Sequence, residues 1–274
     1  MLPKQTQENI SQKGIPDNRF PLEPIITPTS GPTATPTPPP AGGPTPTIDI
    51  AKYGPCKSIP ILMYHHVNSL TGDQKTSVSL TIGTDVFVRQ MDYLSQKGYQ
   101  TIDLNQLVDS LNGGVNLPAK PVVISFDDGY EDFYTDVFPV LKSHNFKAIV
   151  FVSSGLVESS AAYLTWSQIR EMDQSSLVMI GNHTWSHKNL TGSNRSVVEG
   201  EINTSQAQFE SFLGKKPNFF AYPYGADNAT VESVLQQSGF KGALLTYPHL
   251  QCAKLPYRLG RRRIGDAPLS AYGI

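Results

Sequence analysis

Four side chains in two short segments of the sequence could hold a metal ion and activate a water molecule. Asp127 and Asp128 come directly after an apolar run, and His183 and His187 follow another apolar run further along the chain. Two imidazoles and one carboxylate form a three-ligand set that leaves a divalent metal open to water, as a hydrolytic site requires. The second carboxylate is then free to act as a base, so the combination indicates metal-dependent hydrolysis.

Each half of this set also has a plainer interpretation. Asp-Asp-Gly at residues 127–129 is also a sequence typical of a solvent-exposed turn. A spacing of four residues places His183 and His187 on one face of a helical turn, where they could share an ion. The same spacing also fits two hydrogen-bonded, partly buried histidines. The two segments together, rather than either one alone, favour a metal site.

The elements that must position these residues alternate between strands and helices. Continuous apolar runs predict buried strands at residues 59–64, 122–126, 148–152, 177–180, 219–222 and 242–245. Helical periodicity and capping residues predict helices at residues 85–97, at 133–141 with a kink at Pro139, from 165 and from 196 onward, and at 231–237. Buried strands separated by helices imply parallel pairing with right-handed crossovers. About seven such units in roughly 220 residues fit an α/β fold of the distorted (β/α)7-barrel type, with chemistry at the carboxyl ends of the strands, better than an open sheet.

The charge and hydropathy of the chain exclude two classes of protein. Its 274 residues carry 22 Lys and Arg against 23 Asp and Glu, a net charge of −1. The chain therefore lacks the excess of positive charge that nucleic-acid binding normally needs. No stretch approaches the roughly 18 to 20 consecutive apolar residues that cross a bilayer. We therefore expect neither a nucleic-acid partner nor a transmembrane segment in this chain.

Proline is concentrated at the N-terminal end, where 12 of the 22 prolines fall between Pro3 and Pro46. Such a run can neither form a ladder of hydrogen bonds nor bury a core. The sequence therefore predicts a disordered Pro/Thr-rich spacer at residues 1–54 and a folded domain at residues 55–274. Because the first ten residues lack the apolar core of a signal peptide, we expect that a leader or membrane anchor was trimmed off or miscalled.

Two cysteines, Cys56 and Cys252, lie near the two ends of the expected folded domain. Their separation in the sequence excludes a tight cysteine metal site. Two alternatives remain, a disulfide that staples the ends of the domain or a pair of buried thiols.

Three motifs of this chain resemble those of a known enzyme family. Ser-Phe-Asp-Asp-Gly at residues 125–129 and His-Thr-Trp-Ser-His at 183–187 resemble the first two signature motifs of the polysaccharide deacetylases, the NodB-like enzymes of carbohydrate esterase family four. Phe-Ala-Tyr-Pro-Tyr-Gly at 220–225 resembles the third, and the similarity runs over most of residues 59–264. The resemblance implies a distorted (β/α) barrel that removes N-acetyl or O-acetyl groups from glycans.

The resemblance also implies a role for each motif residue. It makes Asp127 the general base, and it makes Asp128, His183 and His187 the ligands of a divalent metal, which is commonly zinc. This agrees with the residues themselves, because a metal acidifies water and a neighbouring carboxylate can take the proton. A backbone N–H near Tyr224 would help to hold the oxyanion.

Departures from the common pattern point to a subgroup. Ala221 stands where most members have an arginine, and a late leucine-containing motif with the acid histidine is not found. Met-Tyr-His-His-Val at 63–67 and Tyr-Arg-Leu-Gly-Arg at 257–261 resemble instead the biofilm poly-N-acetylglucosamine deacetylases, whose motif order is permuted. That similarity implies His65 as the general acid. His66 is a rival, since adjacent strand residues point to opposite faces, and His249 is an outside candidate that is more typical of a loop.

Several other residues near the motifs are candidates for the site. The basic cluster of Arg258 and Arg261 to Arg263 is either a set of exposed positions on a terminal strand or the source of a partner for Asp127, with Arg261 supplying what Ala221 cannot. Aromatic faces can pack on sugar rings. We therefore predict Tyr222 and Tyr224 as substrate-binding residues and add Arg261 from the basic cluster. Tyr130, Trp166 and Trp185 also lie in or beside the motif loops, but they are not assigned to substrate binding, because aromatic residues are more often core.

The preferred interpretation is a metal-dependent N-deacetylase that acts outside the cell, or at its surface, on N-acetylglucosamine polysaccharide. A second interpretation keeps the chemistry and changes the substrate to peptidoglycan, chitin-type oligomers or an O-acetyl ester. A third is a cell-surface glycan-binding module that has lost turnover. The intact set of Asp127, Asp128, His183 and His187 argues against the third, because binding alone does not need a spare base beside three ligands.

Overall fold

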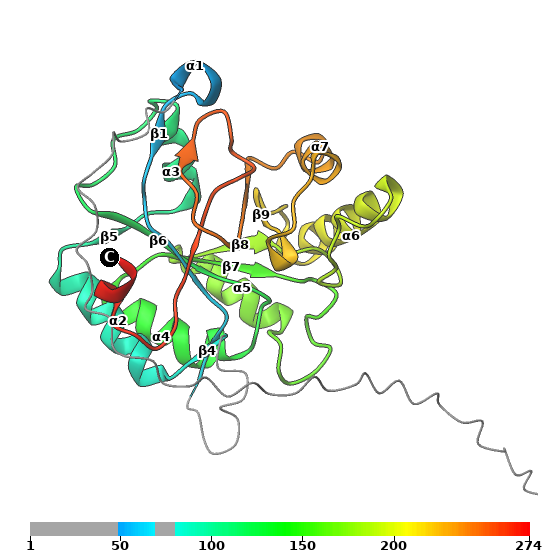
Figure 1. Cartoon of the computed structure of the whole chain (residues 1–274). Coiled ribbons are helices and arrows are strands. Elements are labelled where there is room, and N and C mark those ends of the chain that lie inside the picture. Colours follow the sequence, from blue (N-terminus) through cyan, green and yellow to red (C-terminus); the bar gives the residue numbers. More distant parts are fainter. Residues whose placement is uncertain (1–48, 69–79) are drawn as a thin grey trace, which may run out of the picture. The chain divides into compact units, whose positions relative to one another are not determined.

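The computed structural model describes residues 49–68 and 80–274 (Figure 1). The predicted spacer at residues 1–54 lies outside the described residues except for its last six. Within those six, Ile50–Tyr53 form helix α1, and the Asp49 side chain caps it by accepting a hydrogen bond from the backbone N–H of Lys52. Regular structure therefore begins ahead of residue 55.

A parallel sheet that curls into a distorted barrel carries the domain. Its strands follow the order β10 (Gly242–Leu244), β9 (Phe219–Ala221), β8 (Val178–Asn182), β7 (Ala148–Val152), β6 (Pro121–Phe126), β2 (Ile61–Tyr64) and β12 (Arg262–Arg263). All neighbouring pairs are parallel, and the short β5 (Gln100–Thr101) pairs with the start of β6. The ring closes because Leu259 bridges to Leu244 while the next residues pair with β2. The predicted distorted (β/α)7-type barrel is confirmed.

Two small sheets lie outside this ring. Strand β1 (Cys56–Lys57) pairs antiparallel with β11 (Gln251–Cys252). Strand β3 (His66–Val67) pairs parallel with β4 (Thr81–Ile82) at the end of the barrel where β2 finishes.

Helices connect the strands as the sequence predicts, with three differences. They are α2 (Thr84–Gln96), α3 (Leu104–Leu111), α4 (Phe138–His144), α5 (Trp166–Gln174), α6 (Arg195–Leu213) and α7 (Ala229–Gln237), with short 3-10 turns at Pro223–Gly225 (η3) and Leu269–Tyr272 (η4). Helix α3 was not predicted. The kink expected at Pro139 is a π-helical turn, Phe133–Val137 (η2), that runs into α4. The cap of α6 is Asn194 rather than Ser196, because the Asn194 side chain accepts from the backbone N–H of Val197.

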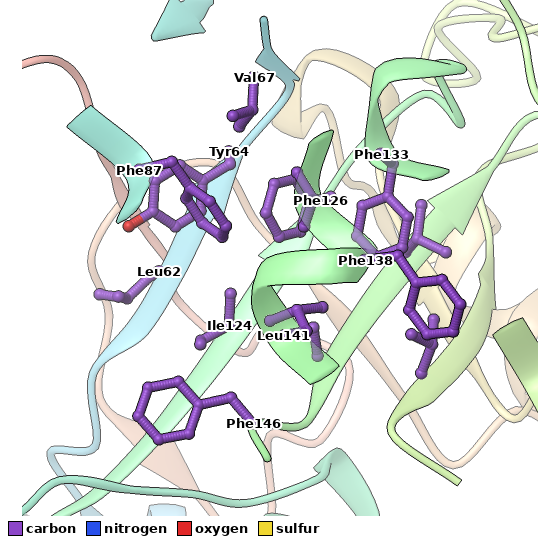
Figure 2. Packing of buried hydrophobic residues seen from close by; sticks show 14 of the residues in the cluster. Leu62, Tyr64, Val67, Phe87, Ile124, Phe126, Phe133, Phe138, Leu141 and Phe146 are labelled. Carbon is purple, nitrogen blue, oxygen red and sulfur yellow. The ribbon is translucent and has the colours of Figure 1, made fainter. Parts of the chain in front are cut away.

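Alternate residues of the strands pack into two separate clusters. The helix-facing cluster contains Leu62 and Tyr64 of β2 and Ile124 and Phe126 of β6, packed against α2, η2, α4 and α5 (Figure 2). The inner cluster contains the residues between them, and its strand members are Ile61, Val123, Ile149, Phe151, Phe219, Ala221 and Leu244. Full burial of each large apolar side chain stabilises the fold by about 1.5–3 kcal/mol. Both faces of these strands are therefore buried, as parallel pairing requires.

A disulfide between Cys56 and Cys252 joins β1 to β11. Of the two alternatives that the sequence left open, the structure has the disulfide. It connects residues 196 positions apart and ties the first strand of the domain to its last quarter. None of the helices in the described residues is both long and apolar enough to cross a membrane.

We expect the double variant Cys56→Ala/Cys252→Ala to have a free energy of unfolding about 2–5 kcal/mol lower than the wild type. The bond restricts the unfolded chain across a long loop, and this restriction is lost in the variant. Guanidinium unfolding of both proteins measures the difference, and reduction of the wild type with dithiothreitol should reproduce it. Equal unfolding midpoints would show that the disulfide contributes nothing to stability.

Candidate active site

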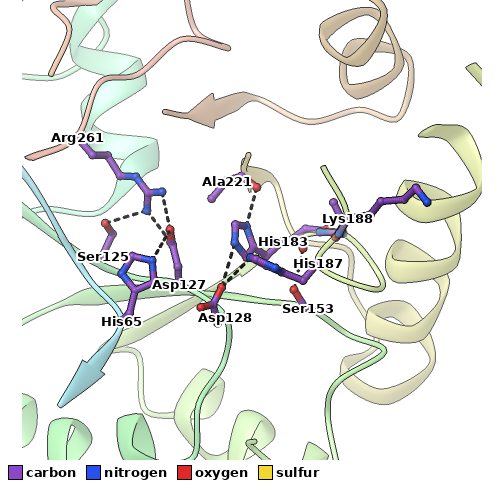
Figure 3. Close-up of polar contacts among 12 residues, drawn as sticks. His65, Ser125, Asp127, Asp128, Ser153, His183, His187, Lys188, Ala221 and Arg261 are labelled. Carbon is purple, nitrogen blue, oxygen red and sulfur yellow. Dashed lines mark hydrogen bonds and ion pairs between the residues drawn. The ribbon is translucent and has the colours of Figure 1, made fainter. Parts of the chain in front are cut away.

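The candidate residues gather at the carboxyl ends of three barrel strands (Figure 3). His65 follows β2, Asp127 and Asp128 follow β6, and His183 follows β8. His187 lies four residues further along the same loop. Since the carboxyl ends of parallel strands meet at one end of the barrel, five residues from distant parts of the sequence come together.

Asp128, His183 and His187 form a group that could hold a metal ion. The Nε2 atom of His183 lies 3.3 Å from Asp128 Oδ1, and the Nε2 atom of His187 lies 3.1 Å from the same oxygen. The sharp turn that presents Asp128 has positive φ at Asp128 (75°) and at Gly129 (80°). A Cβ at Gly129 would lie 2.9 Å from a methyl carbon of Val152, so this turn needs glycine. The structure therefore brings the three predicted ligands together.

The chemistry of these donors fits a divalent metal. Asp128 Oδ1 is buried and has no hydrogen-bond partner among the described residues, although two imidazole nitrogens lie beside it. His183 donates from Nδ1 to the carbonyl of Ala221 at 2.7 Å, which leaves the lone pair on Nε2 for a ligand. Ligand atoms around a tetrahedral zinc ion lie about 3.3 Å from one another. The two separations from Asp128 Oδ1, 3.3 and 3.1 Å, are close to that value.

Electrostatics keep Asp128 ionised. Burial raises the pKa of Asp128, but the neighbouring His183 and His187 imidazoles outweigh this and hold the pKa far below its ordinary value. An ionised carboxylate is the form that binds a metal. The local charges thus favour the state that the ligand role requires.

Arg261 holds the other carboxylate, Asp127, in a two-pronged contact. Its Nη1 and Nη2 atoms each donate to one carboxylate oxygen at 2.6 Å, and its Nε donates to the carbonyl of Leu245 at 2.7 Å. Burial raises the pKa of Asp127, but the charge of Arg261, aided by His183, more than offsets this and lowers the pKa. Asp127 is therefore ionised and fixed in orientation.

The location of Arg261 corrects part of the prediction for this residue. Its side chain is only 1% exposed, so it cannot contact a polymer in solvent, and its assignment as a substrate-binding residue is wrong. The alternative hypothesis, in which Arg261 pairs with Asp127 where Ala221 cannot, agrees with the contacts. Ala221 is itself buried in the inner cluster.

Strand alternation separates His65 from His66. Ile61 belongs to the inner cluster and Tyr64 to the helix-facing one, so His65 continues the inner set. Its Nε2 lies 4.0 Å from Asp127 Oδ2. Burial lowers the pKa of His65, although the charges of Asp127 and Asp128 act in the opposite direction.

His66 points away from this group. Its Nδ1 donates to Asp132 at 2.7 Å, and its ring stacks on Tyr130 with centroids 3.5 Å apart. Tyr163 stacks on Tyr130 at 5.4 Å, so Tyr130 packs between two rings. His249 is exposed in a loop, where its Nδ1 donates to the carbonyl of Leu250. Of the three histidines considered for the acid, the structure places only His65 beside Asp127.

The two tyrosines predicted to bind substrate lie in different environments. Tyr222 is fully buried in a third cluster beside Phe220, and its hydroxyl donates to the carbonyl of Tyr257. Its assignment to substrate binding is therefore wrong, because Ala221 rather than Tyr222 is on the inner side of β9. Tyr224 is 68% exposed, and its ring lies edge-on to His187 with centroids 4.9 Å apart. Of these two tyrosines, only Tyr224 is exposed for contact with a ligand.

The segment between the two histidines is a loop and not the helical turn that their spacing suggested. Thr184 and His187 have positive φ values of 68° and 59°, a conformation that costs a non-glycine residue about 1–3 kcal/mol. The Asn182 side chain accepts from the backbone N–H of Thr184, and Glu201 of α6 accepts from the next two backbone N–H groups. Glu201 is not among the residues predicted for the site, because nothing in the local sequence around it marks it.

Comparisons with known proteins agree with this geometry. Residues 114–243 match the family model described as polysaccharide deacetylase. A curated relative from Escherichia coli K12, named poly-beta-1,6-N-acetyl-D-glucosamine N-deacetylase, is 29% identical over 227 residues, covering 68% of this chain and 33% of the relative. The chain thus spans about a third of the length of the curated relative.

Solved structures show the same fold. The deacetylase PplD of Streptococcus pyogenes, solved with acetate, superposes with a TM-score of 0.72 at 29% identity, covering 77% of this chain and 94% of PplD. IcaB of Ammonifex degensii superposes with a TM-score of 0.68 at 28% identity, covering 78% and 93% of the two chains. Residues 114–243 of this chain are therefore identified as a polysaccharide deacetylase domain.

Proposed function

We propose that this chain hydrolyses the N-acetyl groups of poly-β-1,6-N-acetylglucosamine in a metal-dependent reaction. One observation carries the proposal: a metal-ligand group and a separate, arginine-held carboxylate lie side by side at the barrel mouth, with one histidine next to the carboxylate. The relative from Escherichia coli is named for this activity. The donor set of two nitrogens and one oxygen favours zinc.

Each side chain has a distinct task in the proposed reaction. A divalent ion bound by Asp128, His183 and His187 would lower the pKa of water and polarise the acetamide carbonyl. Asp127 accepts the proton of the attacking water, whose oxygen forms a bond to the carbonyl carbon. As the carbon–nitrogen bond breaks, His65 donates a proton to the nitrogen, so that acetate and a free amine leave. The backbone N–H near Tyr224 is proposed to donate to the oxyanion.

The place of action is proposed to be outside the cell or at its surface. A disulfide forms and persists in oxidising compartments and is rare in the cytosol, and the Cys56–Cys252 bond joins two strands of this domain. A polymer of N-acetylglucosamine also suits a site at the open end of a barrel, where Tyr224 is exposed for contact with a sugar ring.

The proposal is tested by measuring bound metal and released acetate on the same protein. We expect about one zinc ion per chain, removable by a chelator, and acetate release from β-1,6-linked N-acetylglucosamine oligomers that exceeds release from β-1,4-linked ones. Faster release from β-1,4-linked or O-acetylated substrates would change the substrate assignment. Metal binding without acetate release from any of these substrates would indicate that the chain is a glycan-binding module and not an enzyme.

Arg261→Lys should lower kcat/KM for acetate release and shift its pH dependence. An ammonium cannot reproduce two parallel contacts, so the pKa of Asp127 rises. The base works only when ionised, and activity is lost as the pH falls through that pKa. The acidic limb of the pH profile therefore moves to higher pH. At pH values below this limb, kcat/KM of the variant should be roughly tenfold lower than that of the wild type. Turnover and pH profile identical to those of the wild type would reject the role of Arg261.

A further inference from the structure

The loop that carries His187 is hydrogen-bonded to one buried carboxylate, that of Glu201. Its Oε2 accepts from the backbone N–H groups of Trp185 and Ser186 at 3.1 and 2.9 Å. Its Oε1 accepts from the Ser186 hydroxyl at 2.6 Å. Glu201 lies on the buried side of α6. Three donors from two consecutive residues thus converge on this carboxylate, as in the anion-binding nests formed by backbone N–H groups.

The backbone carbonyl groups of the same loop accept hydrogen bonds from a different segment of the chain. The backbone N–H of Ser154 donates to the carbonyl of Thr184, and that of Gly155 donates to the carbonyl of Trp185. These bonds tie the loop to the segment after β7, whereas Glu201 alone takes the N–H groups of residues 185 and 186. Removing its charge would leave these partly buried donors facing a poorer acceptor.

The two histidine ligands depend on this loop to different degrees. His183 follows β8 directly, its backbone N–H donates to the carbonyl of Val152, and its ring donates to Ala221. The described residues offer the Nδ1 of His187 no comparable hydrogen bond, and His187 has positive φ. The position of the His187 ring therefore follows from the conformation of residues 184–186.

We propose that Glu201 is a positioning residue that sets the metal affinity of the site by fixing the loop that presents His187. This inference rests on the proposed function, because it takes Asp128, His183 and His187 to be metal ligands. It adds a residue from α6 that touches none of the reacting atoms. Groups that orient metal ligands in this indirect way change metal affinity by about 10- to 100-fold when they are replaced.

The test measures the Zn²⁺ dissociation constant by competition with a chromophoric chelator. For Glu201→Gln we expect a dissociation constant raised about 10- to 100-fold, with acetate release restored by excess Zn²⁺. Glu199→Gln is the matched control, because Glu199 lies two residues away on the same helix, exposed and paired with Arg195. Its dissociation constant should equal that of the wild type.

Ser186→Ala covers the case in which Glu201→Gln fails to fold. It removes only the hydroxyl contact, and we expect a smaller rise in the dissociation constant, roughly two- to tenfold. A folded Glu201→Gln variant with wild-type affinity would overturn the inference. So would a Ser186→Ala variant with wild-type affinity if Glu201→Gln does not fold. Failure of the wild type to bind Zn²⁺ would instead overturn the proposed function, which distinguishes the two.

Discussion

Asp127→Asn is expected to lower kcat for acetate release by about 10²–10⁴-fold while the zinc content of the protein stays unchanged. The amide has the size of the carboxylate but cannot accept a proton from water. The three ligand residues are untouched, and Asp127 lies beside them without belonging to the group. Single-turnover acetate release and metal analysis on the same preparation measure both quantities.

The neighbouring variant Asp128→Asn is the control for this experiment. It replaces a ligand instead of the base, so we expect it to lose zinc and activity together. Because Asp127→Asn also leaves Arg261 facing an amide in a buried position, thermal unfolding must show that the variant is folded. Acetate release by folded Asp127→Asn at the wild-type rate would reject Asp127 as the base.

The barrel could be predicted because its signal is local and repeated. Residues 148–152 form β7 with the bounds that the apolar run gives, and Thr165 and Gln168 form the capping box of α5. Helix α3 was missed although Asp103 and Gln106 make the same kind of capping box. The residues that mark the start of α3 are therefore present in the local sequence.

Which face of a strand points inward could not be predicted. Alternation alone tells inside from outside only when one face is polar, and here both faces of β2 and β9 are buried. His65 and His66 were therefore indistinguishable, and Tyr222 was assigned to the wrong face. Only the clusters formed with residues distant in sequence, such as Ile61 with Phe151, identify the inner side.

The loop between His183 and His187 shows a second limit of the sequence. A spacing of four residues suggested a helical turn, but two residues with positive φ bring the rings together instead. That conformation depends on Glu201, which is 14 residues after His187 and belongs to another element. A tertiary contact of this kind has no local signature, so the motif predicts the ligands without predicting how they are held.

His65→Phe is expected to lower kcat for N-acetylglucosamine oligomers by about 10²–10⁴-fold. Phenylalanine keeps a planar ring at the inner position beside Asp127 but cannot donate a proton to the amine nitrogen, which is a poor leaving group unless it is protonated. His66→Phe is the matched control. It retains a ring that can stack on Tyr130 and loses only the contact with Asp132, so its kcat should remain near that of the wild type.

An ester substrate separates proton donation by His65 from a structural effect of its removal. The leaving group of 4-nitrophenyl acetate departs as a stable anion and needs no proton, whereas attack by water still needs Asp127. If His65 is the general acid, His65→Phe should lose far less activity on this ester than on the oligomers, while Asp127→Asn loses activity on both. Equal losses of His65→Phe on the two substrates would mean that His65 supports the site without protonating the amine. Because Nε2 of His65 lies 4.0 Å from Asp127 Oδ2, such a result would indicate that His65 acts by supporting Asp127, the base.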